Sequence, residues 1–179
     1  AAAAGAPALR AEFGDRLRSL GFSEDTREGA PVCRWVQGAM ILDVMPLDEK
    51  ILGFSNRWYK AAMGASVTKN LRDDLEIRMV TAPYFVATKL EAFKGRGRGD
   101  FLGSHDLEDV ISVVDGCETL SAEVRAAGTE LSEYVRREIA KLLANPGFID
   151  SLPGFLLPDS ASQLRIGIVL ARLRNLESI

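Results

Sequence analysis

The sequence contains little of what disulfide-rich, zinc-binding or membrane-spanning proteins depend on. Its 179 residues include two cysteines, Cys33 and Cys117, which lie far apart without Cys-x-x-Cys spacing, and one histidine, His105. This pattern argues against a Cys/His zinc site and favours reduced thiols over a disulfide. No apolar run approaches the roughly 20 residues that cross a bilayer, and no signal peptide is visible. We therefore expect a cytoplasmic protein without a membrane partner.

The chain also lacks an excess of positive charge. Its formal net charge is -3 at pH 7, from 22 Lys and Arg residues against 25 Asp and Glu residues. This balance argues against a protein that coats nucleic acid non-specifically, because such binding requires clustered cations. The hydrophobic fraction of 47% is ordinary for a globular protein. The length suits one compact domain, or a small domain with a helical appendage.

The spacing of apolar residues predicts an α+β protein that ends in a helical region. Residues 1–7 show no hydrophobic pattern and form an uncertain terminus. We expect an α/β core over 8–116 and a helical region over 117–179. Within them we expect helices over 8–20, 83–94, from Ser104 or His105 to Gly116, 129–143 and 161–176, strands over 32–36, 39–45, 66–70 and 76–80, and an irregular segment over 51–63.

Lys89 is the first residue that points to chemistry. On the helix that starts near Pro83, it falls inside the apolar stripe, one turn after Phe85. A lysine in a buried stripe either extends its ammonium group to solvent along the helix flank or binds an anion. The anion would be a phosphate or a carboxylate.

Asp106 and Asp109 lie on the next predicted helix, three positions apart and therefore on one side. Asp106, in the first turn, is also explained by a favourable interaction with the helix dipole. Asp109 lies beyond that turn and needs a cation, for which Lys89 is the nearest candidate in sequence. A buried Lys89–Asp109 pair could also be purely architectural.

Arg96 and Arg98 alternate with glycines between these two helices. Glycine allows a backbone to approach a ligand closely, and two guanidinium groups can bind a polyphosphate. A solvated, mobile basic loop is the default interpretation of these residues, since neither a phosphate-loop motif nor a dinucleotide fingerprint is present.

Asp43 lies in an otherwise apolar segment that reads as a central strand. A carboxylate in such a strand is costly unless it is paired or metal-bound. Magnesium sites for nucleotide chemistry use a few carboxylates together with substrate phosphates. Asp43 is therefore a candidate metal ligand.

Two stretches together resemble a known family. The segment Ala-Thr-Lys-Leu-Glu-Ala-Phe over 87–93 and the segment His-Asp-Leu-Glu-Asp-Val over 105–110 are similar to the Lys-Leu…Arg-Asp-x-x-Asp-Leu signature of the AbiEii/AbiGii-type toxin nucleotidyltransferases, in the DNA-polymerase-β-like superfamily. The likeness covers roughly 8–116 and is closer to uncharacterised bacterial relatives than to an established toxin. It implies a nucleotidyltransferase-like mixed sheet with flanking helices.

The resemblance also implies a function: transfer of a nucleoside monophosphate from a nucleoside triphosphate to an RNA or protein acceptor, with two Mg²⁺ ions and a link to toxin–antitoxin systems. By resemblance, Asp43 would be a catalytic and metal-binding carboxylate, Lys89 would neutralise the triphosphate, and Asp109 with Asp106 would orient that lysine or contact the nucleotide. Arg96 and Arg98 are added as phosphate ligands from their charge and position.

The family's first motif, a Gly-Ser turn followed by an Asp-x-Asp pair, would precede Ala8 and is not in this sequence. Two Mg²⁺ ions are expected only where that pair exists upstream. The alternative is a catalytically inactive nucleotide-binding or protein-interaction module on the same fold. The helices from Leu120 onward are expected to cover the sheet or to dock a partner.

Overall fold

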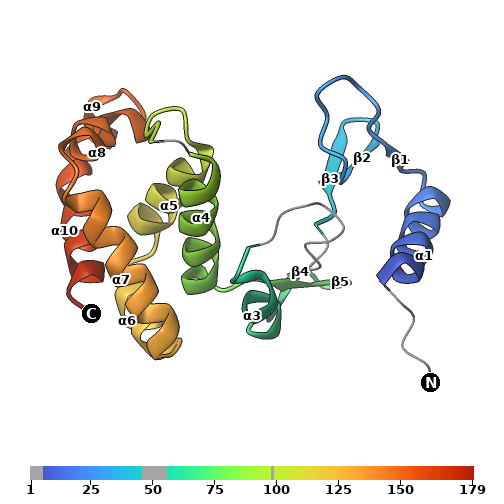
Figure 1. Ribbon diagram of the computed structural model, residues 1–179, viewed down its shortest axis with the longest axis horizontal. Coiled ribbons are helices and arrows are strands. Elements are labelled where there is room, and N and C mark those ends of the chain that lie inside the picture. The colour runs from blue at the N-terminus through green and yellow to red at the C-terminus, as the bar shows by residue number, and fades with distance from the viewer. Residues whose placement is uncertain (1–5, 46–55, 98) are drawn as a thin grey trace. The chain divides into compact units, whose positions relative to one another are not determined.

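The structure is a computed structural model that describes residues 6–45, 56–97 and 99–179. It consists of two compact units, Ala1–Ser55 and Asn56–Ile179, each described here by itself. The chain is α+β with a C-terminal helical region, as the sequence predicts (Figure 1). The described strands form two small antiparallel sheets, one of three strands and one of two, where a single mixed sheet was expected. None of the described helices is long and apolar enough to span a bilayer.

The first unit contains a helix that stops where glycine allows the chain to turn. Helix α1 (Ala6–Ser19) is followed by Gly21, whose φ of 88° favours glycine. An added Cβ at Gly21 would also lie 2.6 Å from Nε2 of Gln37. That amide nitrogen donates a hydrogen bond to the Leu20 carbonyl at 2.8 Å, which ties the end of the helix to the sheet.

The sheet of this unit has the strand order β1-β2-β3, with β1 at Ser23–Glu24, β2 at Arg34–Gln37 and β3 at Met40–Asp43. The predicted hairpin turn is confirmed, with Gly38 at a φ of 58°. The core of the described part of the unit is small and consists of Leu17, Cys33 and Trp35.

The second unit is built around α4 (Ala82–Arg96) and α5 (His105–Gly116), which pack against each other. Helix α4 also contacts α6 (Leu120–Ala126) and α7 (Thr129–Leu143), and α10 (Ile166–Glu177) packs on α5, α6 and α7. Their apolar stripes meet in one buried core. The remaining helices are α3 (Tyr59–Gly64), α8 (Pro146–Ser151), the 3₁₀ helix η1 (Leu152–Phe155) and α9 (Ser160–Leu164).

The second predicted hairpin is also present in this unit. Strand β4 (Val67–Arg72) pairs with β5 (Leu75–Met79) across a turn at Asp73 and Asp74.

Two expectations for secondary structure differ from the structure. The expected irregular segment contains α3, and the expected last helix is divided into α9 and α10 at Arg165, where the backbone remains helical. The division between the two units, after Ser55, falls inside the expected 8–116 core.

Candidate functional site

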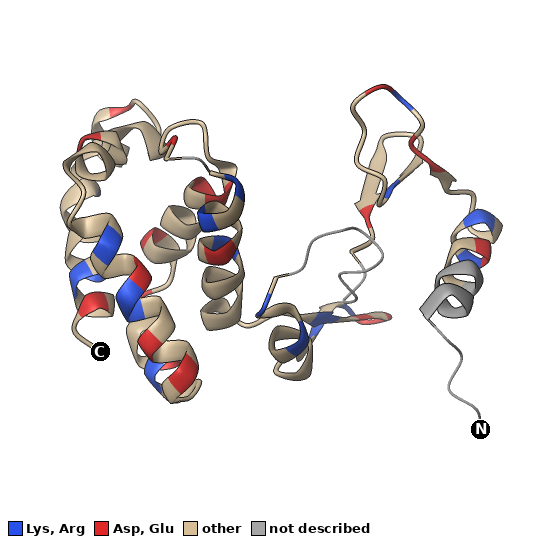
Figure 2. Ribbon diagram, in the orientation of Figure 1, with Lys and Arg blue, Asp and Glu red and all other residues tan. Residues whose placement is uncertain are grey.

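The candidate site lies where α4 and α5 face each other. Helix α4 starts after the extended residue Thr81 with Pro83 in its first turn, where the missing N–H costs nothing. Helix α5 is capped at its N-terminus by Ser104, whose hydroxyl accepts a hydrogen bond from the Leu107 N–H. The chain reverses between the helices, so the end of α4 lies beside the start of α5. Figure 2 shows acidic and basic positions gathered at this meeting point.

Four charged side chains form one cluster there, which we call the α4–α5 charge cluster: Lys89, Arg96, Asp106 and Asp109. Nζ of Lys89 lies 2.5 Å from Oδ2 of Asp109 and 3.5 Å from Oδ1 of Asp106. Arg96 donates from Nε and Nη2 to both oxygens of Asp106, at 2.8 and 2.7 Å. The order of charges is therefore Arg96, Asp106, Lys89, Asp109, which alternates in sign. The expected pairing of Lys89 with Asp109 is confirmed.

Burial differs sharply along this row. The Asp106 side chain is 6% exposed, that of Lys89 26%, that of Asp109 43% and that of Arg96 68%. Burial alone would raise the pKa of Asp106, but the hydrogen bonds and charges of Arg96 and Lys89 outweigh it and hold that pKa below its usual value. Asp106 is therefore the ionised centre of the cluster, and Asp109 and Arg96 are its solvent-facing ends.

The position of Arg96 corrects one expectation. It was expected in a glycine-rich loop, but α4 continues through Gly95 and ends at Arg96 itself. Glycine in a helix costs only about 1 kcal/mol relative to alanine, which packing and the Asp106 pair can offset. Arg96 is thus a partner of Asp106 on a helix. Arg98, the other predicted phosphate ligand, lies outside the described residues.

Lys89 is also held by an aromatic ring that the sequence analysis did not assign to the site. Its Nζ lies 5.6 Å from the ring centroid of Phe85, one turn earlier on α4. Cation–π contact and two carboxylates fix the ammonium group at the flank of the helix. The expected apolar stripe of α4 is confirmed, since two of its members, Val86 and Leu90, are buried.

Asp43 belongs to the first unit, whereas the residues of the α4–α5 charge cluster belong to the second. The expectation of a central strand is not met, because β3 is at the edge of the sheet among the described strands and its residues are exposed. Asp43 accepts two hydrogen bonds from Arg34, both at 2.8 Å. These hydrogen bonds lower the pKa of Asp43. The lone carboxylate is therefore satisfied by an arginine on the neighbouring strand.

This pair should contribute little to stability. Arg34 and Asp43 side chains are 29% and 39% exposed, and exposed ion pairs contribute at most about 1 kcal/mol. We expect Asp43→Asn to lower the local unfolding free energy of the β2–β3 hairpin by less than about 1 kcal/mol. Native-state hydrogen exchange of the hairpin amides measures this directly. A loss of several kcal/mol would contradict the interpretation of Asp43 as a surface ion-pair partner.

The carboxylates that the structure describes do not fit a two-magnesium centre. No three His, Cys, Asp or Glu side chains in residues 13–45, 56–97 and 99–179 lie close enough together to hold one metal ion. The oxygens of Asp106 face Arg96 and Lys89, and those of Asp43 face Arg34. Such cationic neighbours disfavour Mg²⁺, whose sites combine carboxylates with phosphates and water.

A second polar group in the helical unit was missed by the sequence analysis. The Tyr134 hydroxyl, on α7, donates a hydrogen bond of 2.7 Å to Oε2 of Glu91 on α4. Burial, followed by the Glu91 carboxylate, raises the pKa of Tyr134. Tyr134 and the buried Glu138 both fall on the apolar stripe of α7 at helical spacing, and this spacing was the signal that could have found them. Tyr134 connects α7 to α4 through Glu91, whereas Glu138 pairs with Arg137 and Lys141 on its own helix.

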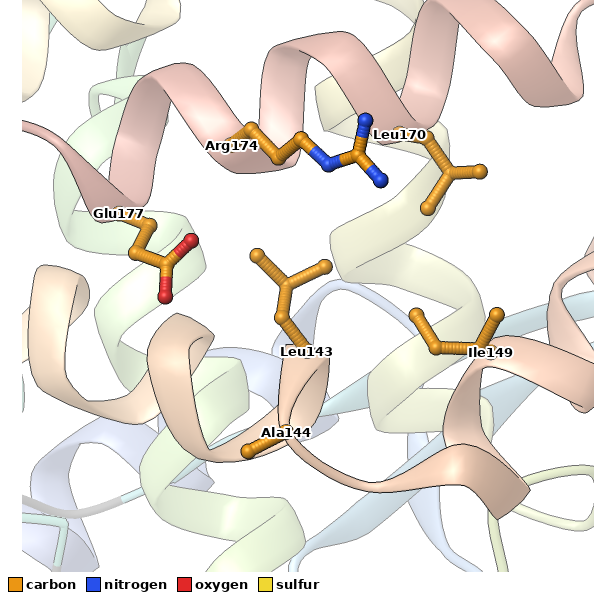
Figure 3. A pocket seen from close by; sticks show the side chains of 6 residues that line it. All are labelled: Leu143, Ala144, Ile149, Leu170, Arg174 and Glu177. Carbon is orange, nitrogen blue, oxygen red and sulfur yellow. The ribbon is translucent and has the colours of Figure 1, made fainter.

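The described residues also line a hollow of about 350 Å³ among α7, α8 and α10. Figure 3 shows Arg174 and Glu177 at one side of it, across from the apolar Leu143 and Ile149. No predicted site residue lines this hollow. It therefore adds nothing to the α4–α5 charge cluster.

No family model, curated protein or solved structure matches this chain. The resemblance to the AbiEii/AbiGii-type nucleotidyltransferases consequently rests on the residues quoted above, and family membership remains a prediction.

Proposed function

We propose that this chain is a nucleotidyltransferase-type protein whose helical unit, Asn56–Ile179, binds the phosphates of a nucleoside triphosphate. One observation carries the proposal. Residues from two separate stretches of the suspected signature, Lys89 on α4 and the Asp106–Asp109 pair on α5, form a single cluster at the helix flank. The resemblance gives the same residues to the nucleotide, with the lysine as the group that neutralises phosphate.

The cluster has the charge distribution for this task. Asp106 is buried and fully engaged, so it fixes Arg96 and Lys89 in place. Asp109 is nearly half exposed and can leave Lys89 without uncovering a buried charge. A triphosphate, with several negative charges, would replace Asp109 as the partner of the ammonium group. Arg96 offers Nη1, which lies outside its pair with Asp106, as a further donor.

The test is calorimetric titration of the protein with each nucleoside triphosphate in the presence of Mg²⁺. Lys89→Ala should weaken binding at least about tenfold, because a charge-assisted hydrogen bond is worth about 1.5–3 kcal/mol. Lys94→Ala is the matched control. Lys94 is on the same helix, its side chain is 54% exposed, and its Nζ makes only a loose ion pair, 3.9 Å from Oε2 of Glu91. Its affinity should stay within about twofold of the wild type. Equal affinity of Lys89→Ala and the wild type, or no binding of any triphosphate, would refute the proposal.

The catalytic half of the proposal is transfer of a nucleoside monophosphate to an RNA or protein acceptor. The described carboxylates do not form a two-magnesium centre, so no catalytic step is assigned to them. This observation favours a second candidate, a catalytically inactive nucleotide-binding or protein-interaction module on the same fold. Incubation with labelled nucleoside triphosphate and Mg²⁺ separates the two. Triphosphate binding without pyrophosphate release or label transfer supports the inactive module.

A further inference from the structure

The β4–β5 hairpin leaves most of its surface uncovered. Every residue of β4, and all of β5 except the half-buried Ile77, is exposed. The sheet has only these two strands among the described residues, so the outer edge of β5 carries no strand there (Figure 1). Two-stranded hairpins are marginally stable in water, and an open edge is a template for a further strand.

Strand β5 has one apolar and one polar face. Its Leu75, Ile77 and Met79 alternate with Glu76 and Arg78, so the three apolar residues share one face. On β4, Val67 pairs with Met79 on that face, where Lys69 lies opposite Ile77 and Arg72 opposite Leu75. Thr68 pairs with Arg78 and Asn70 with Glu76, and these four polar residues occupy the opposite face. Leu75, Val67 and Met79 are 38%, 41% and 43% exposed, so the apolar face is only partly covered.

The sequence of β5, Leu75-Glu76-Ile77-Arg78-Met79, is complementary to itself when read in the opposite direction. If two copies pair antiparallel around Ile77, each Glu76 lies opposite Arg78 of the other copy on the polar face. Leu75 then lies opposite Met79 on the apolar face, and Ile77 opposite its own copy. Opposite charges and apolar pairs directly across a strand pair are both stabilising.

Strand β4 does not have this property. It carries Lys69 and Arg72 and no acidic residue, so self-pairing along its edge gathers like charges, which natural sheets use to prevent association. Arg78 remains able to make the new pair. It donates from Nη2 to the Ser66 carbonyl at 3.0 Å, and its Nε and Nη1 lie outside that bond.

We propose that the outer edge of β5 is a homodimer interface, at which two copies of this chain join their hairpins into a four-stranded antiparallel sheet. A two-fold axis at Ile77 makes the contact isologous and closed, so it limits assembly to a dimer. The interface uses none of the residues of the α4–α5 charge cluster, and the proposal is independent of nucleotide binding.

The test is sedimentation equilibrium of the full chain over a wide concentration range. The wild type should show a reversible monomer–dimer equilibrium. Glu76→Arg alone should place two arginines opposite each other, and Arg78→Glu alone two glutamates, so each variant should be monomeric. An equimolar mixture of the two should dimerise again, because every Arg then faces a Glu. Glu133→Arg, the same charge change at an exposed position of α7, is the control and should dimerise like the wild type.

Three outcomes would overturn the proposal. The first is a wild type that remains monomeric at its highest soluble concentration. The second is a dimer that persists in both single variants, which would place the interface elsewhere. The third is an equimolar mixture that stays monomeric although both variants retain the wild-type circular dichroism spectrum. If either variant loses that spectrum, restored dimer in the mixture still supports the pairing and its absence counts against it.

Discussion

Phe148→Ala should lower the free energy of unfolding of the helical unit by about 3–5 kcal/mol. The Phe148 side chain is 0% exposed, so the substitution removes a whole ring from the core and leaves a cavity. Its ring also meets Phe101 edge-on at a centroid distance of 5.8 Å and contacts Phe155 at 6.5 Å. Aromatic pairs of this kind add stability beyond the area they bury. Urea unfolding followed by circular dichroism at helical wavelengths measures the loss.

Leu164→Ala is the matched control for this prediction. Leu164 is 81% exposed on α9, and a surface substitution of this type usually changes stability by less than about 0.5 kcal/mol. Phe148→Leu should fall between the two, because leucine refills part of the cavity. If Phe148→Ala and Leu164→Ala cost the same, the ring is not part of a close-packed core.

The helices and hairpins were the part of the fold that local sequence determines. Ser104 as an N-cap, Pro83 in a first turn and glycine at a positive φ each act on the backbone within a few residues of themselves. The predicted helix over 129–143 agrees with α7 because five apolar residues repeat at helical spacing there. Such signals need no knowledge of distant contacts, which is why they were predicted correctly.

Features that depend on distant contacts were not predictable in the same way. Gly95 suggested that α4 would stop, but Arg96 extends the helix and is held by Asp106 on α5. Asp43 looked central because its neighbours are apolar, although β3 is exposed at the edge of the described sheet. Apolar residues in a strand do not by themselves indicate whether a second strand or another layer of the structure covers them.

The candidate site shows the same distinction. The pairing of Lys89 with Asp109 followed from two helix faces that each needed an opposite charge. The role of Asp106 as the shared partner of two cations did not follow, because it requires the register of α5 against α4. Sequence spacing can place two residues on one face, but the offset between neighbouring helices is set by packing.

Asp106→Asn should lower the free energy of unfolding of the helical unit by about 2–4 kcal/mol at neutral pH. The Asp106 carboxylate is 6% exposed and accepts two charge-assisted hydrogen bonds from Arg96. An asparagine keeps the shape but leaves Arg96 and Lys89 without a buried anion. Asp109→Asn, one turn later and 43% exposed, should cost less than about 1 kcal/mol. Urea unfolding of the two variants measures both losses.

The same carboxylate should give stability a characteristic dependence on pH. The pKa of Asp106 is lower in the folded chain than its usual value of 3.8, so the folded state favours the ionised form. This contribution is fully present above the unfolded pKa and is lost as the pH falls through the lower folded pKa. Asp106→Asn should therefore flatten the acid limb of the unfolding free energy below about pH 4. An acid limb as steep as that of the wild type would show that other carboxylates, such as the buried Glu138 with Arg137 and Lys141, control the acid sensitivity of the fold.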